Sequence, residues 1–186
     1  MKEISENPEQ KQEVNESKNE NAEKNREEAL TEMEDDLAPE SEKTDGLSET
    51  EKQEIKEETG WSDEIVDSVK SKEEAQIYQD ANLKEEDVDG KKCLIRDDID
   101  YDQKDEFGRT NKERMENGNP PLTKNGETVE LHHIGQKQDS PLAELTTQEH
   151  RGKGNDTILH DKTKESEINR SEFSKEREAH WESRAN

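Results

Sequence analysis

The negative charge of this chain is concentrated toward its N-terminus, and this limits how much of the chain can build a core. Residues 1–60 hold 8 Lys and Arg against 21 Asp and Glu, a net charge of −13 within a total of −24. Residues 122–186 hold 10 against 13 and are close to balanced. A segment with few apolar side chains and a high net charge cannot bury enough surface to offset its ordering entropy. We therefore predict a disordered acidic tail over residues 1–58.

The next part of the chain, residues 59–121, shows patterns typical of short helices and one hairpin. Apolar spacing and capping residues predict two small amphipathic helices between residues 62 and 82. An Asp-Gly dipeptide between two short runs with strand character predicts a hairpin over residues 88–95. A short helix over residues 110–117 is followed by a glycine and then by two prolines, which prevent it from continuing. We interpret this part as a small helical and hairpin region that precedes the main domain.

In the last part, residues 122–186, polar and apolar residues alternate from Glu127 to His133, as they do in a strand. A strand is predicted up to residue 133 after a tight Asn-Gly turn, and a second short strand is predicted over residues 142–145. A threonine then caps a helical turn that carries His150, and a helix over about residues 171–184 closes the chain. The predicted fold class is therefore α+β, with a small ββα core and flanking helices.

Several classes of protein are excluded by what the sequence lacks. The single Cys93 rules out an intrachain disulfide framework and any zinc site built from several cysteines. No apolar run approaches the roughly 18 residues that a membrane-spanning helix needs. The N-terminal residues lack the apolar region of a signal peptide. We expect a protein without a membrane segment that is either cytoplasmic or secreted by a non-classical route.

All five histidines fall in the last third of the chain: His132, His133, His150, His160 and His180. Histidine is both a common metal ligand and the usual general base near neutral pH. Consecutive side chains of a strand point to opposite faces, so an adjacent pair at a strand end can divide metal binding from contact with substrate or water. A strand, a turn, a strand and a helix that carry spaced histidines form a ββα-metal arrangement, which leaves coordination positions open to water and phosphate.

These residues resemble a known family. The segments that carry the resemblance are Leu131-His132-His133-Ile134-Gly135-Gln136, Ala143-Glu144-Leu145, Glu149-His150-Arg151-Gly152-Lys153-Gly154-Asn155 and Ile158-Leu159-His160. They are similar to the LHH family, a group of predicted nucleases of the HNH/endonuclease VII superfamily with the treble-clef, or His-Me finger, fold. The resemblance covers about residues 60–186, is strongest over 127–160 and leaves the acidic tail unexplained. Members of the family are commonly C-terminal modules of bacterial polymorphic toxins, neutralised by an immunity protein.

The resemblance implies roles for four of the histidines. His132, His150 and His160 would bind a divalent metal ion (Zn, Ni, Mg or Mn), and His133 would activate the attacking water. The implied activity is the endonucleolytic hydrolysis of nucleic acid, with DNA favoured, and the implied partner is a cognate immunity protein. One departure concerns the base: the asparagine that orients it in many HNH proteins is absent from the matching stretch at residues 140–142. Asn155, which lies beyond His150, is a candidate replacement.

Each site residue also has a structural interpretation. His150 could lie on a helix surface, His160 could cap the preceding helix, and His180 is expected to pack beside Trp181. Four basic residues are candidates for phosphate contacts, although each could also be merely solvated: Arg151, Lys153, Arg170 and Lys175.

Two other functions compete with a nuclease. One is a non-catalytic module in which imidazoles and a metal only stabilise a small fold. The other is a disordered acidic interaction protein, which the net charge favours. The acidity also argues against a nuclease, because nucleic-acid binders usually carry a basic surface. A nuclease built on this chain should therefore bind its substrate weakly at physiological salt when metal is absent.

Overall fold

The computed structural model describes residues 46–186, so the first 45 residues of the predicted acidic tail lie outside the described part of the chain. The tail prediction does not hold at residues 49–58, because Glu49–Thr59 form helix α2. Ser48 and Glu51 make a reciprocal capping box at its start, and Gly60 ends it with a φ of 74°. A single apolar side chain, Ile55, anchors the helix in the core. Good caps and helix-favouring Glu and Lys therefore compensate for the missing apolar face.

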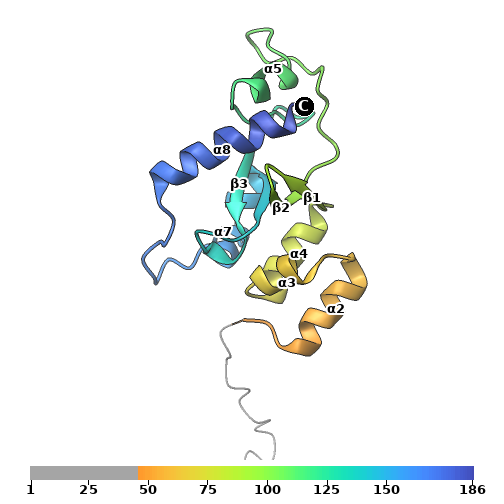
Figure 1. Cartoon of the computed structure of the whole chain (residues 1–186), viewed down its shortest axis with the longest axis vertical. Coiled ribbons are helices and arrows are strands. Elements are labelled where there is room, and N and C mark those ends of the chain that lie inside the picture. The colour runs from red at the N-terminus through yellow and green to blue at the C-terminus, as the bar shows by residue number, and fades with distance from the viewer. Residues whose placement is uncertain (1–45) are drawn as a thin grey trace, which may run out of the picture. The chain divides into compact units, whose positions relative to one another are not determined.

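The rest of the described chain alternates short helices and strands (Figure 1). The helices are α3 (Asp63–Ser68), α4 (Lys72–Asp80), α5 (Asn111–Glu116), α6 (Thr147–Arg151), α7 (Asn155–Leu159) and α8 (Arg170–Arg184), with a 3-10 turn, η1, at Ile134–Gln136. The strands are β1 (Lys84–Val88), β2 (Lys91–Ile95), β3 (Val129–His133) and β4 (Leu142–Thr146). The α+β fold class and the short helices predicted from capping patterns are confirmed.

The four strands form one mixed sheet in the order β1-β2-β4-β3. The predicted hairpin is confirmed as β1 and β2, whose turn residues Asp89 and Gly90 have φ values of 52° and 74°. Positive φ at both positions is what a type I′ turn requires. β2 pairs in parallel with β4, and β4 pairs antiparallel with β3. The sheet therefore joins the region expected to precede the nuclease, residues 59–121, to the expected nuclease core, residues 122–186.

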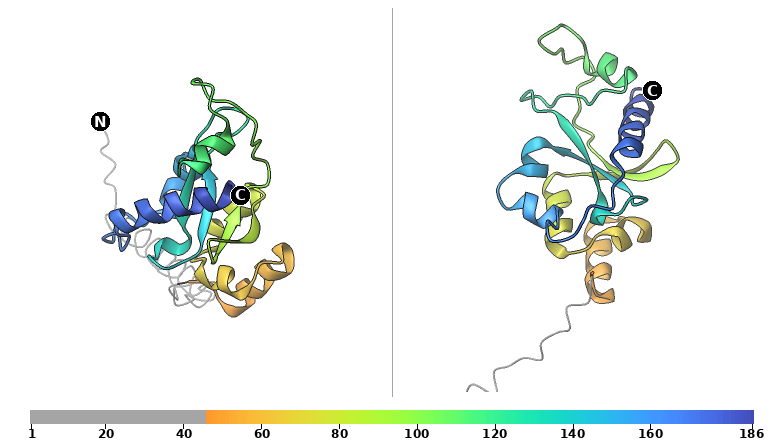
Figure 2. Two further views of the ribbon diagram at one scale, coloured as in Figure 1. Left: turned by 45° about the horizontal axis from the view of Figure 1, so that its top comes forward. Right: turned by 90° about the vertical axis from the view of Figure 1, so that its left-hand side faces the viewer.

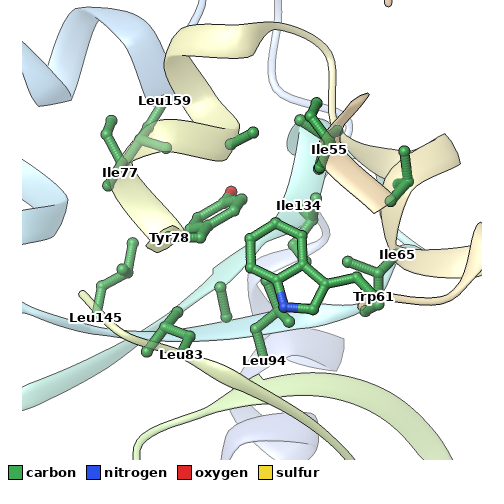
Figure 3. Close-up of a cluster of buried hydrophobic side chains, with 14 residues drawn as sticks. Ile55, Trp61, Ile65, Ile77, Tyr78, Leu83, Leu94, Ile134, Leu145 and Leu159 are labelled. Carbon is green, nitrogen blue, oxygen red and sulfur yellow. The ribbon is translucent and has the colours of Figure 1, made fainter. Parts of the chain in front are cut away.

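Apolar side chains cover both faces of the sheet. One face packs against α2, α3, α4 and α7 through a cluster that includes Trp61, Tyr78, Leu94, Leu145 and Leu159 (Figure 3). The other face packs against α5 and α8 through Cys93, Met115, Val129, Leu131 and Trp181. Figure 2 shows the corresponding arrangement of helices on the two sides of the strands. Trp61 is 6% exposed and packs edge-on against Tyr78, as expected for a packing anchor.

The segment after β3 makes a close approach to the upstream helices. Gly135 has a φ of 71°, and a Cβ atom built on it would lie 2.2 Å from the carbonyl oxygen of Ser68. Its backbone N–H donates to the carboxylate of Glu74 in α4 at 2.8 Å. The upstream helices therefore dock directly on the chain that follows the two adjacent histidines. No helix within residues 46–186 is long and apolar enough to cross a membrane.

Candidate metal centre and nuclease site

The strands β3 and β4 and the helix α6 form a ββα unit that presents the histidines. Alternation along β3 sends His132 toward α6 and α7 and sends His133 toward α8, where it contacts Phe173. α6 begins at a capping box formed by Thr146 and Glu149, which fixes the start of the turn that carries His150. The predicted division of the adjacent pair between two faces is thus seen in the geometry.

Three imidazoles converge on the first face. Nε2 of His150 lies 3.2 Å from Nδ1 of His132 and 3.1 Å from Nε2 of His160. Zinc–nitrogen bonds of 2.0–2.1 Å at tetrahedral angles place two ligand nitrogens about 3.3 Å apart. Within residues 46–186, these three side chains are also a group whose donor atoms lie close enough together to share one ion. The three residues singled out as ligands are brought together.

Carboxylates hold the far nitrogens of two of these rings. Nδ1–H of His150 donates to Glu130 at 2.7 Å, and Nδ1–H of His160 donates to Asp156 at 2.9 Å. An ionised carboxylate only accepts hydrogen bonds, so each bond puts the proton on Nδ1 and leaves the lone pair on Nε2. Two lone pairs facing each other at 3.1 Å repel unless a cation lies between them. The donor set therefore fits a metal ion.

A carboxylate also lies near the far nitrogen of His132, but at a longer distance than in the other two rings. Its Nε2 is buried and has no hydrogen-bond partner, and it lies 3.9 Å from Oε1 of Glu74. Glu74 is fully buried, and it accepts hydrogen bonds from the Tyr78 hydroxyl and from the backbone N–H groups of Lys70 and Gly135. An unsatisfied buried nitrogen is costly. A metal ion at Nδ1 would polarise this ring and strengthen its interaction with the carboxylate.

Burial favours the neutral form of two of the converging rings, those of His132 and His150. Removal from water, together with the neighbouring imidazoles of His150 and His160, lowers the pKa of His132 well below the usual histidine value. Burial also lowers the pKa of His150, although its bond to Glu130 opposes this shift. A neutral imidazole is the form that binds a metal. His150 is only 6% exposed, which excludes the surface interpretation, and His160 ends α7 while also joining the cluster.

His133 has a different environment on the second face. Its Nε2–H donates to Oε2 of Glu176 in α8 at 2.8 Å, and its ring lies 4.5 Å, centroid to centroid, from that of Phe173. The other oxygen of Glu176 accepts from the ammonium group of Lys91 in β2. Although burial opposes ionisation, the bonds from His133 and Lys91 lower the pKa of Glu176. The carboxylate is therefore charged and leaves the lone pair of His133 on Nδ1.

His180 takes part in a buried polar cluster rather than in the metal site. Its Nε2–H donates to Glu144 at 2.8 Å, and its ring packs edge-on against Trp181, as predicted. Glu144 is fully buried in β4, and it also accepts from Nε of Arg184 at 2.8 Å and from the backbone N–H of Arg96 at 2.9 Å. Despite its burial, the hydrogen bonds from His180 and Arg184 lower the pKa of Glu144. The cluster fastens α8 to the sheet.

Sequence reasoning missed the carboxylates. The sequence patterns assign no role at the site to Glu130, Glu74 or Glu176. Glu176 lies three residues after Phe173 and four before His180, so helical spacing puts it on the same side of α8, but the sequence does not distinguish an acid there from a solvated one. Asn155 donates its side-chain N–H to the carbonyl of Glu149 and closes α6 against α7. Asn155 was the candidate replacement for the HNH asparagine, but the side chain that hydrogen-bonds to His133 is Glu176.

The basic residues considered as phosphate contacts all lie at the surface. Arg151 is largely exposed and pairs with Glu130, and Lys153, Arg170 and Lys175 are exposed or partly exposed.

Gly152 permits a tight path between α6 and α7, since a Cβ atom there would lie 2.2 Å from the carbonyl oxygen of Gln148.

The ββα unit brings three imidazoles together and places a fourth histidine at the next position of β3. This arrangement suits a small metal-assisted nuclease, and the comparison with known families agrees with that interpretation. Residues 110–186 match the model of the LHH family, described as a nuclease of the HNH/ENDO VII superfamily with conserved LHH. This C-terminal part of the chain therefore belongs to the LHH nuclease family, which makes a nucleic acid its expected class of substrate. No solved structure matches the chain significantly.

Proposed function

We propose that the protein is a metal-dependent endonuclease in which His132, His150 and His160 hold one divalent cation and His133 is the general base. The observation that carries this proposal is the convergence of three imidazole nitrogens, two of them 3.1 Å apart with their far nitrogens on carboxylates. Such a set presents lone pairs to one point and leaves coordination positions free for substrate. We further propose that residues 46–186 act as one catalytic unit.

When bound, the cation supplies Lewis-acid stabilisation of the charge that develops on the phosphate and the leaving oxygen. The chain supplies the rest. Glu130 and Asp156 keep the proton on Nδ1 of His150 and His160, so their Nε2 atoms face the cation. On the opposite face of β3, His133 has its lone pair on Nδ1 and takes the proton of the attacking water. A positioned base of this kind contributes about 10²–10⁴ in rate.

The substrate we propose is DNA, as the family resemblance favours. The net charge of residues 122–186 is only −3, and their exposed cations include Arg151 and Lys153, which closely follow His150 in the chain. These cations would contact the phosphate backbone without reading bases. Few phosphate contacts mean weak binding without metal and a shallow dependence on salt.

The proposal is tested with the full chain stripped of metal by EDTA. Supercoiled plasmid and a structured RNA are incubated with it in Mg²⁺, Mn²⁺, Ni²⁺ or Zn²⁺. We expect nicking of the plasmid with at least one of these ions, no cleavage in EDTA, and loss of both metal binding and cleavage in His150→Ala. Cleavage that persists in EDTA would refute the metal-dependent mechanism, and cleavage of RNA alone would refute the substrate. A purely structural metal module, the competing function, predicts metal binding with no cleavage of either substrate.

The toxin role and the immunity partner are supported by the family resemblance alone. A nuclease toxin should arrest growth when the full chain is produced in a bacterial cell, and His133→Ala should relieve the arrest at equal protein level. Equal growth with both chains would refute the toxin role.

A further inference from the structure

We infer that Glu176 of α8 is the positioning residue for the base His133, in the place where many HNH nucleases use an asparagine. The inference rests on the proposed function, because it concerns how the proposed base is held. It adds a residue from the C-terminal helix to a site otherwise built by the ββα unit and α7.

The geometry fixes both the tautomer and the direction of the ring. Oε2 of Glu176 lies 2.8 Å from Nε2 of His133, and the carboxylate can only accept, so the proton is on Nε2. The phenyl ring of Phe173, one turn earlier in α8, packs against the imidazole at a centroid distance of 4.5 Å. The ring is therefore held at one edge by a hydrogen bond and on one side by an aromatic contact. Nδ1 remains as the proton acceptor.

Glu176 is itself held from two directions. Its Oε1 pairs with Lys91 at the start of β2, and the two side chains are about three-quarters buried. Four residues further along α8, His180 donates to the buried carboxylate of Glu144 in β4. Arg184, one more turn along, donates to the same carboxylate. α8 is thus fastened to the sheet at one and two turns beyond Glu176, so the carboxylate meets His133 on a rigid element.

The other candidate groups within residues 46–186 do not supply this contact. The stretch at residues 140–142, where an HNH asparagine would stand, contains Ser140, whose hydroxyl donates to the carbonyl of Lys137. Asn155 donates to the carbonyl of Glu149. Of the residues that the structure describes, Glu176 is the one that hydrogen-bonds to the His133 ring.

The test compares Glu176→Ala and Glu176→Gln with the control Glu172→Ala in the full chain. Glu172 lies one turn earlier on α8, is exposed, and contacts Gln138 rather than a histidine. In Glu176→Ala we expect kcat to fall about 10–100-fold, the range typical of a lost orienting partner, with KM for plasmid and metal affinity unchanged. The glutamine variant can still accept from Nε2–H through its amide oxygen, so it should recover part of kcat. Glu172→Ala should match the parent.

A second readout does not depend on activity. Long-range ¹H–¹⁵N correlation spectra of the metal-free protein, assigned with His133→Ala, report which nitrogen of His133 carries the proton. We expect the Nε2–H tautomer alone in the parent and in Glu176→Gln, and a mixture of tautomers in Glu176→Ala. Loss of the pair with Lys91 lowers the thermal midpoint of Glu176→Ala, so its spectra are recorded well below that midpoint, where backbone amide shifts away from α8 match those of the parent.

The outcomes separate the two proposals. If Glu176→Ala keeps the parental kcat and the single tautomer while His133→Ala is inactive, the inference is overturned and the proposed function stands. If the parent cleaves nothing with any metal, the proposed function fails. In that case, loss of the single tautomer in Glu176→Ala still supports positioning by Glu176, and its retention overturns it.

Discussion

Replacing Glu130 by glutamine should weaken metal binding, because it removes the charge behind one ligand ring. The carboxylate of Glu130 accepts from Nδ1–H of His150 at 2.7 Å. Loss of such a partner typically lowers metal affinity 10–100-fold, which is about 1.4–2.8 kcal/mol. The Glu130 side chain is 25% exposed, and the amide oxygen of glutamine can still accept from Nδ1–H. Both facts favour the lower end, so we expect about a tenfold increase in the dissociation constant.

The assay is a calorimetric titration of the metal-free full chain with Zn²⁺ at pH 7.5, with a competing chelator if binding is tight. Glu130 also pairs with Arg151, whose side chain is 63% exposed, so Arg151→Ala is the matched control. A surface ion pair of this kind contributes about 0–1 kcal/mol, and its loss should leave the dissociation constant nearly unchanged. Equal affinity in Glu130→Gln and the parent, or equal weakening in the two variants, would refute the reasoning.

Three further predictions concern stability. Glu144→Ala leaves His180 and Arg184 buried without their carboxylate and should lower the free energy of unfolding by about 3–5 kcal/mol, as measured by urea denaturation; a loss below about 1 kcal/mol would contradict the buried cluster. Folding lowers the pKa of His132 and that of His150, so the unfolded chain takes up protons first as the pH falls. The free energy of unfolding of the metal-free protein should therefore be smaller at pH 5.5 than at pH 7.5, and an equal or larger value at pH 5.5 would be contrary evidence. Gly135→Ala should destabilise the protein more than Gly126→Ala, which has a similar positive φ but open space, because only the first brings a Cβ atom against the Ser68 carbonyl; similar thermal midpoints would argue against that contact.

The local elements could be predicted because their signals are local. The Asp-Gly turn, the capping threonine before α6 and the glycine after α5 each fix a boundary within a few residues. Alternation along β3 was enough to separate His132 from His133. The same reasoning underestimated α2, whose stability depends on its caps and on one buried contact, Ile55, rather than on a continuous apolar face.

The carboxylates behind the histidines could not be predicted because tertiary pairing selects them. Glu74 and Glu176 lie 58 residues before His132 and 43 residues after His133, in a chain that holds 52 Asp and Glu. Nothing in their own sequence neighbourhood distinguishes them from solvated acids. The parallel pairing of β2 with β4 is equally non-local, and so is the ion pair between Lys91 of β2 and Glu176 of α8. The high acidic content, which argued against a nuclease, thus includes the groups that orient its histidines.

The central proposal is that His132 binds the metal ion while its neighbour His133 acts as the general base, and His133→Ala tests it most directly. The measurement is the single-turnover rate of plasmid cleavage at saturating metal, in the ion that best supports the parent, together with the metal dissociation constant of the same protein. We predict parental metal affinity and a rate lower by about 10²–10⁴-fold, because the base is removed and the three ligands remain. A parental rate, or a loss of rate explained entirely by lost metal, would contradict the account.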